Sequence, residues 1–282
     1  MSDTMRAVVI EEPGGPEVLD IRDDWPKPEA VSGRVLIRVM AFGLNRGEMY
    51  TRLGQSPSVA FPRVLGIECA GIVEAAPGTS FEPGQTVIAT TGGMGRAYDG
   101  GYAEFTSVPA ENVHAVETTL DWTQLAAAPE AFHTAWGGLE PALGIEAGQS
   151  LLIRGGSSAV GLVAANYARA KGLTVLSTTR DPAKAGRLRD FGVDHVVIDD
   201  DAIAATVRET LPDGVDAMFD LVGTRVLDDS FACVRRGGTL CMAGLLGGEW
   251  VIPEFAPGAV IPSTTKFTYF SSSATPMPTA AL

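Results

Sequence analysis

A glycine-rich segment near the middle of the chain has the composition of a phosphate-binding turn. It runs Gly155-Gly-Ser-Ser-Ala-Val-Gly161, after an apolar run at 150–154 and before a helical pattern at 159–171. Small residues let the backbone approach a pyrophosphate, the amides and dipole of a helix start face that anion, and Gly161 lets helix and strand pack closely. We therefore expect a dinucleotide here, the alternative being a tight strand-to-helix turn without a ligand. The residues assigned to the cofactor are Gly155, Gly156, Ser157, Ser158, Ala159, Val160 and Gly161.

The tip of the second apolar run of this half, 174–179, indicates which cofactor binds. An acidic residue there takes the ribose hydroxyls, whereas a basic one takes the 2′-phosphate. The nearest acid, Asp181, precedes Pro182 and is suited to capping a helix. NADPH is therefore favoured over NADH. The phosphate would be held by Ser177, Thr178, Thr179, Arg180 and Lys184, although the two cations could instead be a solvated pair at a helix start.

Two polar residues in the first third of the chain could act on a carbonyl group. Tyr50 could donate a hydrogen bond to a carbonyl oxygen, and Asn45 could orient a carboxamide or a quinone oxygen. Both lie in a segment where a short helix should start near Arg46 and end at Gly54. In that setting a tyrosine can simply pack and an asparagine can simply cap the helix, so the residue types alone leave these alternatives open.

The histidines and cysteines do not form a metal-binding pattern. None of the three histidines has a second ligand at zinc-binding spacing, and the three cysteines include no CxxC pair. We expect structural or surface histidines, reduced thiols and no zinc. The residues concerned are His114, His133, His195, Cys69, Cys233 and Cys241.

The overall composition is that of a globular chain: 282 residues, 45% apolar and 20% charged. Its 21 basic and 34 acidic residues give a net charge of −13, which disfavours nucleic acid and anionic membranes as partners. No apolar run approaches the ~20 residues that a membrane span needs, and the N-terminus lacks the layout of a signal peptide. A cytoplasmic location is expected.

The elements that would position these residues change in character along the chain. Residues 1–120 read as short strands separated by Gly and Pro turns, which is typical of a strand-rich, barrel-like domain. From residue 149, apolar strands alternate with helical runs, the pattern of a doubly wound parallel sheet. An α/β fold is predicted, with connecting helices at 121–148, a nucleotide-binding domain at 149–271 and a short terminal segment at 272–282.

The expected strands are 5–11, 34–41, 66–75, 85–91 and 102–108 in the first domain, and 150–154, 174–179, 195–198, 215–221, 239–243 and 266–271 in the second. The expected helices, besides the one near Arg46, are 121–138, 159–171, 182–191, 200–210 and 224–234.

Five motifs in a fixed order carry a resemblance to a known family. In chain order they are Asn45-Arg-Gly-Glu-Met-Tyr50, Leu65-Gly-Ile-Glu-Cys-Ala-Gly71, Asp99-Gly-Gly-Tyr-Ala-Glu104, Phe132-His-Thr-Ala-Trp136 and the glycine-rich turn. This pattern resembles the medium-chain dehydrogenase/reductase superfamily over essentially the whole chain. Within it, the chain is similar to the zinc-independent NADPH:quinone oxidoreductases, the zeta-crystallin-like group. The resemblance implies a GroES-like catalytic domain and a Rossmann domain.

The departures from the wider superfamily bear on the chemistry. Zinc-dependent members carry a Gly-His-Glu motif whose histidine binds catalytic zinc, whereas this chain has Gly66-Ile67-Glu68. The cysteine ligand and the four-cysteine lobe of those enzymes are also missing, so chemistry on a zinc-bound alkoxide is disfavoured. Glu68 itself could be a buried, paired carboxylate or a cleft residue. The family also implies a further C-terminal return to the catalytic domain, so we expect that part to be truncated here.

The resemblance also implies roles for individual residues. Asn45 and Thr134 would lie beside the nicotinamide, and residues 157–160 would hold the pyrophosphate. Tyr50 would stand on the substrate side. The cofactor cleft would be lined by Leu221, Val222 and Gly244.

These observations predict a metal-free reductase that passes hydride from NADPH to a quinone or another conjugated carbonyl, with the proton coming from water or Tyr50. An enoyl or enone reductase of the same superfamily is one alternative. A catalytically weak nucleotide-binding protein is the other, because of the early C-terminus. The family further implies a homodimer through the edge strand at 266–271. The apolar side chains of this strand are Phe267, Tyr269 and Phe270. Without a dimer they would form an exposed apolar edge, unless they are buried within the monomer, which is the alternative.

Overall fold

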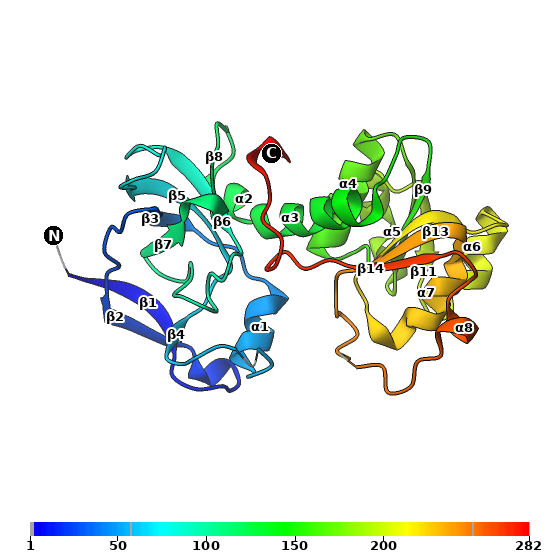
Figure 1. Ribbon diagram of the computed structural model, residues 1–282, viewed down its shortest axis with the longest axis horizontal. Helices are drawn as coiled ribbons and strands as arrows, with labels where there is room; N and C mark the ends of the chain where they lie inside the picture. The colour runs from blue at the N-terminus through cyan, green and yellow to red at the C-terminus, as the bar shows by residue number, and fades with distance from the viewer. Residues whose placement is uncertain (1–2, 57, 250, 282) are drawn as a thin grey trace. The chain divides into compact units, whose positions relative to one another are not determined.

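The computed structural model describes residues 3–56, 58–249 and 251–281, and it divides into two compact units. The first unit comprises Met1–His133 with Ser272–Leu282, and the second comprises Thr134–Ser271. Figure 1 shows the elements of each unit. The chain therefore leaves the first unit once and returns to it with its C-terminal segment.

The first unit is built on antiparallel strands, as its turn-rich sequence predicts. A three-stranded sheet has the order β2-β1-β4, and a five-stranded sheet has the order β7-β3-β5-β6-β8. Alternate residues of β3, such as Val35 and Ile37, pack with Val73 and Val87 in a core beneath the larger sheet. The strands are β1 (Thr4–Ile10), β2 (Asp20–Pro26), β3 (Arg34–Ala41), β4 (Arg63–Val64), β5 (Glu68–Ala75), β6 (Thr86–Thr90), β7 (Phe105–Pro109) and β8 (Val113–Ala115).

The helical stretch expected at 121–138 is broken into two helices. The structure has α2 (Trp122–Ala126) and α3 (Pro129–Gly137), and a π-helical turn at Gly138–Leu143 follows. Pro129 lacks the amide hydrogen that would continue the first helix, so the break falls just before it. The short helix expected near Arg46 is present as α1 (Arg46–Arg52).

The C-terminal segment is bonded to the first unit. His133 Nε2 donates to the Thr275 carbonyl oxygen at 2.8 Å, and the Ser272 hydroxyl donates to Glu130 Oε1 at 2.9 Å. His114 Nδ1 lies 3.1 Å from Thr279 Oγ1. The segment thus bonds to a unit whose other residues lie more than a hundred positions earlier.

The second unit contains one parallel sheet with the strand order β11-β10-β9-β12-β13-β14, which is the order of a doubly wound Rossmann sheet. Its strands are β9 (Ser150–Arg154), β10 (Thr174–Thr179), β11 (His195–Ile198), β12 (Val215–Asp220), β13 (Val234–Met242) and β14 (Lys266–Tyr269). Its helices are α4 (Ala159–Ala170), α5 (Ala185–Asp190), α6 (Ala204–Thr210), α7 (Leu227–Cys233) and α8 (Pro257–Val260).

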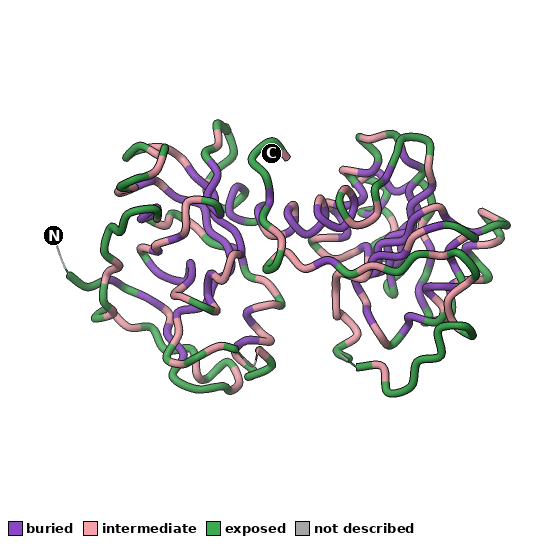
Figure 2. The backbone as a smooth tube through the Cα atoms, in the orientation of Figure 1, coloured by how far each residue is buried: buried purple, intermediate pink, exposed green. Residues whose placement is uncertain are grey.

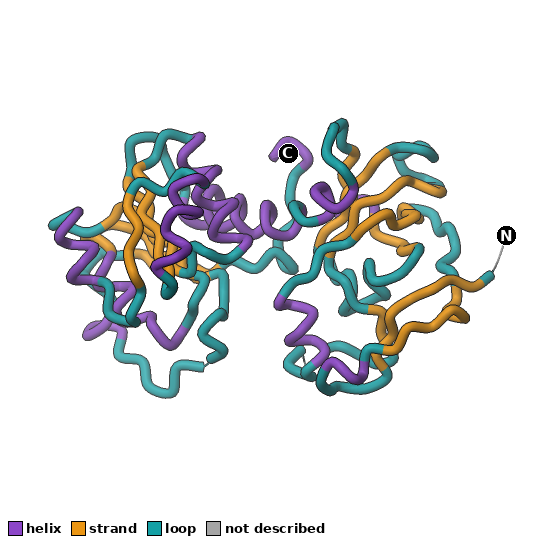
Figure 3. The backbone as a smooth tube through the Cα atoms, turned by 180° about the vertical axis from the view of Figure 1, so that it is seen from behind, coloured by secondary structure: helices purple, strands orange, loops and turns teal. Residues whose placement is uncertain are grey.

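Helices cover both faces of this sheet, as Figure 3 shows. Successive residues of β9 point to opposite faces: Leu151 packs in the core that includes Leu162 of α4, and Leu152 packs in the core that includes Phe231 of α7. The backbone of the central strands is accordingly buried, and most of the exposed backbone lies outside them (Figure 2).

Candidate active site

The glycine-rich turn lies between β9 and α4, where the sequence predicts it. Gly155 adopts a φ of +82°, which lets the chain turn directly off the strand. Ser158 caps α4, since its hydroxyl accepts the Gly161 amide at 3.1 Å and donates to the Gly155 carbonyl at 2.8 Å. As the first two helical residues, Ala159 and Val160 have amides without partners inside the helix. The turn therefore presents the donors that an anion needs.

Two features of this turn bear on its expected role in binding a pyrophosphate. A side-chain carbon added at Gly161 would lie 2.6 Å from the Cα of Gly156, so only glycine allows the helix to pack this close. One added at Gly156 would lie 1.6 Å from the Ser177 hydroxyl oxygen. That hydroxyl is buried and makes no hydrogen bond to any described residue. A buried polar atom left unsatisfied beside a turn of glycines is consistent with a ligand-binding position.

The end of β10 carries buried hydroxyl groups, and exposed cationic side chains follow it. Thr178 Oγ1 accepts the Gly155 amide at 3.0 Å and donates to Asp199 at 3.2 Å, and Thr179 Oγ1 accepts the Asp181 amide at 3.2 Å. Ser177, Thr178 and Thr179 are all buried. The Thr178 and Thr179 hydroxyls thus bond the turn and the strand end, whereas the Ser177 hydroxyl makes no hydrogen bond to a described residue, and a contact between these three hydroxyls and a phosphate stays a prediction.

Arg180 and Lys184 are exposed, and neither forms an ion pair within the described part of the chain. Asp181 caps the following turn by accepting the Ala183 amide at 3.0 Å, which confirms the structural role expected for it. This end of β10 consequently offers two cations and no uncommitted carboxylate for a phosphate-bearing ribose.

The loop after β12 borders the same turn. A side-chain carbon at Gly155 would lie 3.3 Å from Leu221 Cβ and 3.5 Å from Val222 Cγ2. Gly244 fits against the Leu221 backbone, where an added carbon would lie 2.3 Å from the carbonyl oxygen. The structure thus brings these three residues to the glycine-rich turn.

A buried network holds the strand ends in place beneath this turn. Arg154, fully buried at the end of β9, donates to both oxygens of Asp199 at 3.1 Å and to Asp229 at 2.8 Å. Asp220, at the end of β12, accepts the amides of Val222 at 2.7 Å and Gly223 at 2.9 Å. Sequence reasoning did not identify this network, because its partners are far apart along the chain.

In the first unit, Asn45 is the residue that precedes α1. Its amide nitrogen Nδ2 donates to Glu68 Oε1 at 2.7 Å, and its backbone amide donates to Glu48 Oε2 at 2.9 Å. Asn45 therefore starts α1, as its capping interpretation expects, and its side chain holds a second carboxylate, while its orientation of a carboxamide or a quinone oxygen stays a prediction. The spacing of Asn45 and Glu48 is that of a capping box, a signal that could have identified Glu48 from the sequence.

Glu68 is buried and paired, one of the two environments considered for it. Its Oε2 accepts the Glu130 backbone amide at 2.7 Å. Burial raises the pKa of Glu68 to about 7, with repulsion from Glu48 adding to the rise, while the hydrogen bonds from Asn45 and Glu130 oppose it. Burial also raises the pKa of Glu48, whose Oε1 accepts the Ile67 amide at 3.0 Å. Two buried carboxyl groups thus support the start of α1.

The remaining expected site residues lie on helices. Tyr50 is half-buried in α1, and Thr134 is buried in α3, where the second unit begins. The structure places Asn45 just before α1 and Tyr50 within it, both in the first unit, and Thr134 in the second.

No group of three or more metal-ligating side chains occurs in the described ranges 3–56, 58–249 and 251–281. Within those ranges, no helix is long and apolar enough to cross a membrane. The three cysteines are free and buried.

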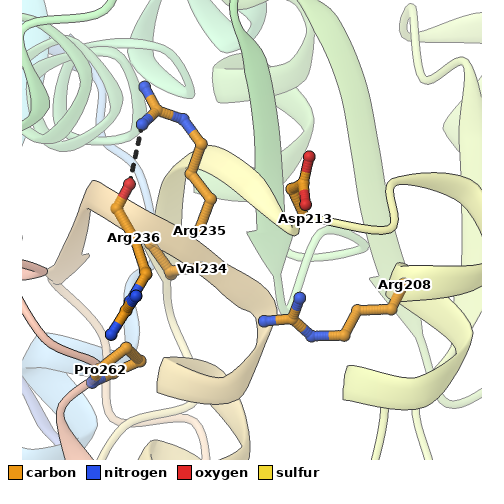
Figure 4. A pocket seen from close by; sticks show the side chains of 6 residues that line it. All are labelled: Arg208, Asp213, Val234, Arg235, Arg236 and Pro262. Atoms are coloured by element: carbon orange, nitrogen blue, oxygen red, sulfur yellow. Dashed lines mark hydrogen bonds between the residues drawn. The ribbon is translucent and has the colours of Figure 1, made fainter.

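A cavity of about 400 Å³ opens at the N-terminal ends of β12 and β13. Figure 4 shows the side chains that line it, three of which are arginines. Arg208 donates to the Ala232 and Pro212 carbonyls, and Arg235 binds Asp216 at 2.6 Å. Because open α/β sheets bind ligands at the carboxyl ends of their strands, this cavity is separate from the candidate nucleotide site. It is lined by Arg208, Asp213, Val234, Arg235, Arg236 and Pro262.

Two family models match the chain in the places where the two folds lie. The alcohol dehydrogenase GroES-like domain matches residues 31–118, and the zinc-binding dehydrogenase model matches residues 159–272. Together with the strand order and the glycine-rich turn, these matches define a medium-chain dehydrogenase/reductase.

Individual relatives identify the branch. The quinone oxidoreductase of Rattus norvegicus is 32% identical over 255 residues, which are 89% of this chain and 76% of the rat protein. Among solved structures, AibC aligns with a TM-score of 0.87 at 27% identity, covering 96% of this chain and 83% of AibC. A mycobacterial protein complexed with NADPH aligns with a TM-score of 0.83 at 30% identity, covering 95% and 81% of the two chains. The chain belongs to the zinc-independent quinone oxidoreductase branch of the superfamily and is an oxidoreductase.

Proposed function

We propose that this protein reduces a quinone or another conjugated carbonyl with NADPH and without a metal ion. The observation that carries the proposal is the turn at 155–161, which ends in free helix amides and is followed along the chain by the two unpaired cations at the tip of β10. NADPH, when bound, supplies the hydride. The relatives named quinone oxidoreductase support the acceptor class.

Different residues of the nucleotide-binding end bind the pyrophosphate and the 2′-phosphate of the cofactor. The amides of Ala159 and Val160 bind the pyrophosphate, and Ser158 fixes them by capping α4. Arg180 and Lys184 bind the 2′-phosphate. A carboxylate at this tip would instead bind the free ribose hydroxyls of NADH, but among the described residues the nearest one, Asp181, already accepts the Ala183 amide.

Residues in each unit have a proposed role at the reacting end, and each is considered within its own unit. Asn45, held by Glu68, and Thr134 orient the nicotinamide, and Tyr50 donates a hydrogen bond to the acceptor oxygen. Leu221, Val222 and Gly244 provide an apolar wall beside the glycine-rich turn. An acceptor that spreads negative charge over a conjugated system needs no zinc for its reduction, which agrees with Ile67 at the position where zinc-dependent relatives carry a histidine.

A homodimer in the cytoplasm is the proposed state. β14 is an edge strand on which Tyr269 is 57% exposed and Phe267 is 39% exposed. Phe270, by contrast, is buried against Gly137 within the unit, so only part of the expected apolar edge is available. Light scattering at high protein concentration tests this state, and a monomer mass would contradict it.

The test of function is NADPH consumption with 1,4-benzoquinone, a naphthoquinone and an unsaturated ketone, run beside NADH and with a chelator present. We expect chelator-resistant turnover that prefers NADPH and a quinone. Turnover confined to the unsaturated ketone would indicate an enone reductase instead. NADPH binding without consumption by any acceptor would indicate a nucleotide-binding protein that lacks catalysis.

A further inference from the structure

Arg96 is a cation without a counter-ion beside α1. Its side chain is half-buried, its Nε is buried, and that Nε makes no hydrogen bond to a described residue. Nor does its guanidinium form an ion pair within the described part of the chain, although the chain carries 34 acidic residues. Asp99, three residues on, binds Arg63 at 2.9 Å instead. A buried donor left unpaired costs free energy unless a ligand or water satisfies it.

The segment that carries Arg96 is held tightly in place. Gly92, Gly93 and Gly95 all have positive φ values, and so does Thr91 at 56°. The Thr91 amide donates to the Ile67 carbonyl at 2.7 Å, and a side-chain carbon at Gly95 would lie 2.8 Å from the Gly66 carbonyl oxygen. The Arg96 amide donates to the Gly93 carbonyl at 3.0 Å. Glycine adopts these φ values readily, and the hydrogen bonds of the segment hold the backbone that carries Arg96.

The guanidinium lies against the face of α1 that carries Tyr50. A side-chain carbon at Gly47 would lie 3.1 Å from Arg96 Nη2 and 3.3 Å from Ile67 Cδ1. Tyr50 follows Gly47 by three residues, hence on the same face, and helical side chains lean back toward the N-terminus of their helix. Arg96, Ile67 and the proposed hydrogen-bond donor Tyr50 thus share one patch of the first unit.

We propose that Arg96 binds the acceptor oxygen and stabilises the negative charge that develops there. The inference rests on the proposed function and extends it. When a conjugated carbonyl accepts hydride, a C–H bond of NADPH breaks and leaves NADP⁺, a new C–H bond forms on the acceptor carbon, and an electron pair of the acceptor moves onto its carbonyl oxygen, which then takes a proton from water or Tyr50. A guanidinium stabilises such an oxyanion without being consumed. Arg96 thereby supplies a positive charge close to Ile67, in a family that has no catalytic zinc ion to supply one.

Steady-state kinetics with NADPH and neutral 1,4-benzoquinone test this role. Arg96→Met should lower kcat/KM for the quinone about a hundredfold, the loss typical of one oxyanion donor, with NADPH affinity unchanged. Arg96→Lys should recover part of the rate, because it restores the charge but not the planar fork. Arg46→Met is the matched control: it removes one positive charge from the exposed start of the same helix, and it should stay within about twofold of wild type.

Three outcomes would overturn the proposal. In the first, Arg96→Met retains the wild-type kcat/KM for the quinone. In the second, Arg46→Met lowers kcat/KM as much as Arg96→Met does, which would mean that the effect comes from net charge rather than from Arg96. Arg96→Met could also spare benzoquinone and impair only an acceptor bearing a carboxylate, which would assign Arg96 to a permanent anion. Thermal melting of each variant identifies any loss of activity that is due to unfolding. If Arg96→Met unfolds, the kcat/KM of Arg96→Lys is compared with that of the wild type instead.

A binding readout separates this inference from the proposed function. With NADP⁺ present, 4-nitrophenol is titrated spectroscopically, and we expect its pKa to fall on binding to the wild type but not to Arg96→Met. A lowered pKa in a protein that shows no quinone turnover would retain the oxyanion site and reject the reductase. Turnover with no difference between wild type and Arg96→Met in either assay would reject the oxyanion site alone.

Discussion

The carboxylate of Glu68 accepts a hydrogen bond of 2.7 Å from the side-chain amide of Asn45. Its second oxygen accepts the Glu130 amide, also at 2.7 Å. Glu68 therefore joins the start of α1 to the start of α3 through a buried group that can gain or lose a proton near neutral pH.

The free energy of unfolding should consequently fall between about pH 4.5 and pH 7 because of Glu68. Its pKa is about 7 in the folded protein and 4.5 as the reference, so the folded state binds more protons in this window. Stability then decreases as the pH rises, by up to about 3 kcal/mol for a group this buried. Glu68→Gln should flatten the dependence of Tm on pH across the window, whereas Glu82→Gln, at an exposed turn, should keep it. Parallel curves for wild type and Glu68→Gln would contradict the assignment.

Arg180→Ala should weaken NADPH binding while leaving NADH binding nearly unchanged. In the proposed function, the exposed guanidinium of Arg180 at the tip of β10 binds the 2′-phosphate, which only NADPH carries. A charge-assisted hydrogen bond is worth about 1.5–3 kcal/mol, which corresponds to roughly a ten- to hundredfold change in Kd. Fluorescence titration of both cofactors measures it. Equal losses for NADPH and NADH would refute the phosphate contact.

Gly161→Ala should reduce both stability and NADPH affinity. The added carbon would lie 2.6 Å from the Gly156 backbone, which cannot move away without reshaping the turn. Overpacking of this kind costs about 1–3 kcal/mol. Gly186→Ala provides the comparison, since its added carbon meets no atom within 4 Å, and it should be neutral or stabilise α5 slightly. Denaturant unfolding and NADPH titration of both variants decide the point, and similar behaviour of the two would remove the packing argument.

Tyr50→Phe should lower kcat with quinone or enone acceptors while leaving the Kd for NADPH unchanged. Loss of a donor to the acceptor oxygen removes an interaction that matters in the transition state, with a typical effect of about a hundredfold. Stopped-flow measurement of single-turnover NADPH oxidation isolates the chemical step. A change confined to KM would instead assign Tyr50 to binding.

Much of the second unit could be predicted from sequence because its signals are local. Strand, glycine-rich turn and helix follow one another within 150–171, and the Asp181-Pro182 pair predicts its own cap. In the first unit, β2 was missed because it is largely exposed and charged, so it shows no apolar alternation. β4 and β8 are too short to produce a pattern.

The less predictable parts of the candidate site depend on partners that are distant in sequence. Glu68 meets Glu130 across 62 positions, and Arg154 meets Asp229 across 75. The sequence suggests that three hydroxyls at the end of β10 are available to a phosphate, whereas in the structure all three residues are buried. They are Ser177, Thr178 and Thr179. The isolation of Arg96 is likewise a property of the folded chain, since the sequence alone gives it nearby acids such as Asp99.

The return of the C-terminal segment to the first unit has a consequence for biosynthesis. Residues 134–271 form an uninterrupted insertion within the first unit, and Ser272, Thr275 and Thr279 bond to that unit after the insertion. A ribosome therefore releases every residue of the Rossmann sheet before these three hydrogen bonds of the first unit can form. The strands of the first unit are thus synthesised long before the residues at 272–279 that bond to them, and domains generally fold as units during synthesis.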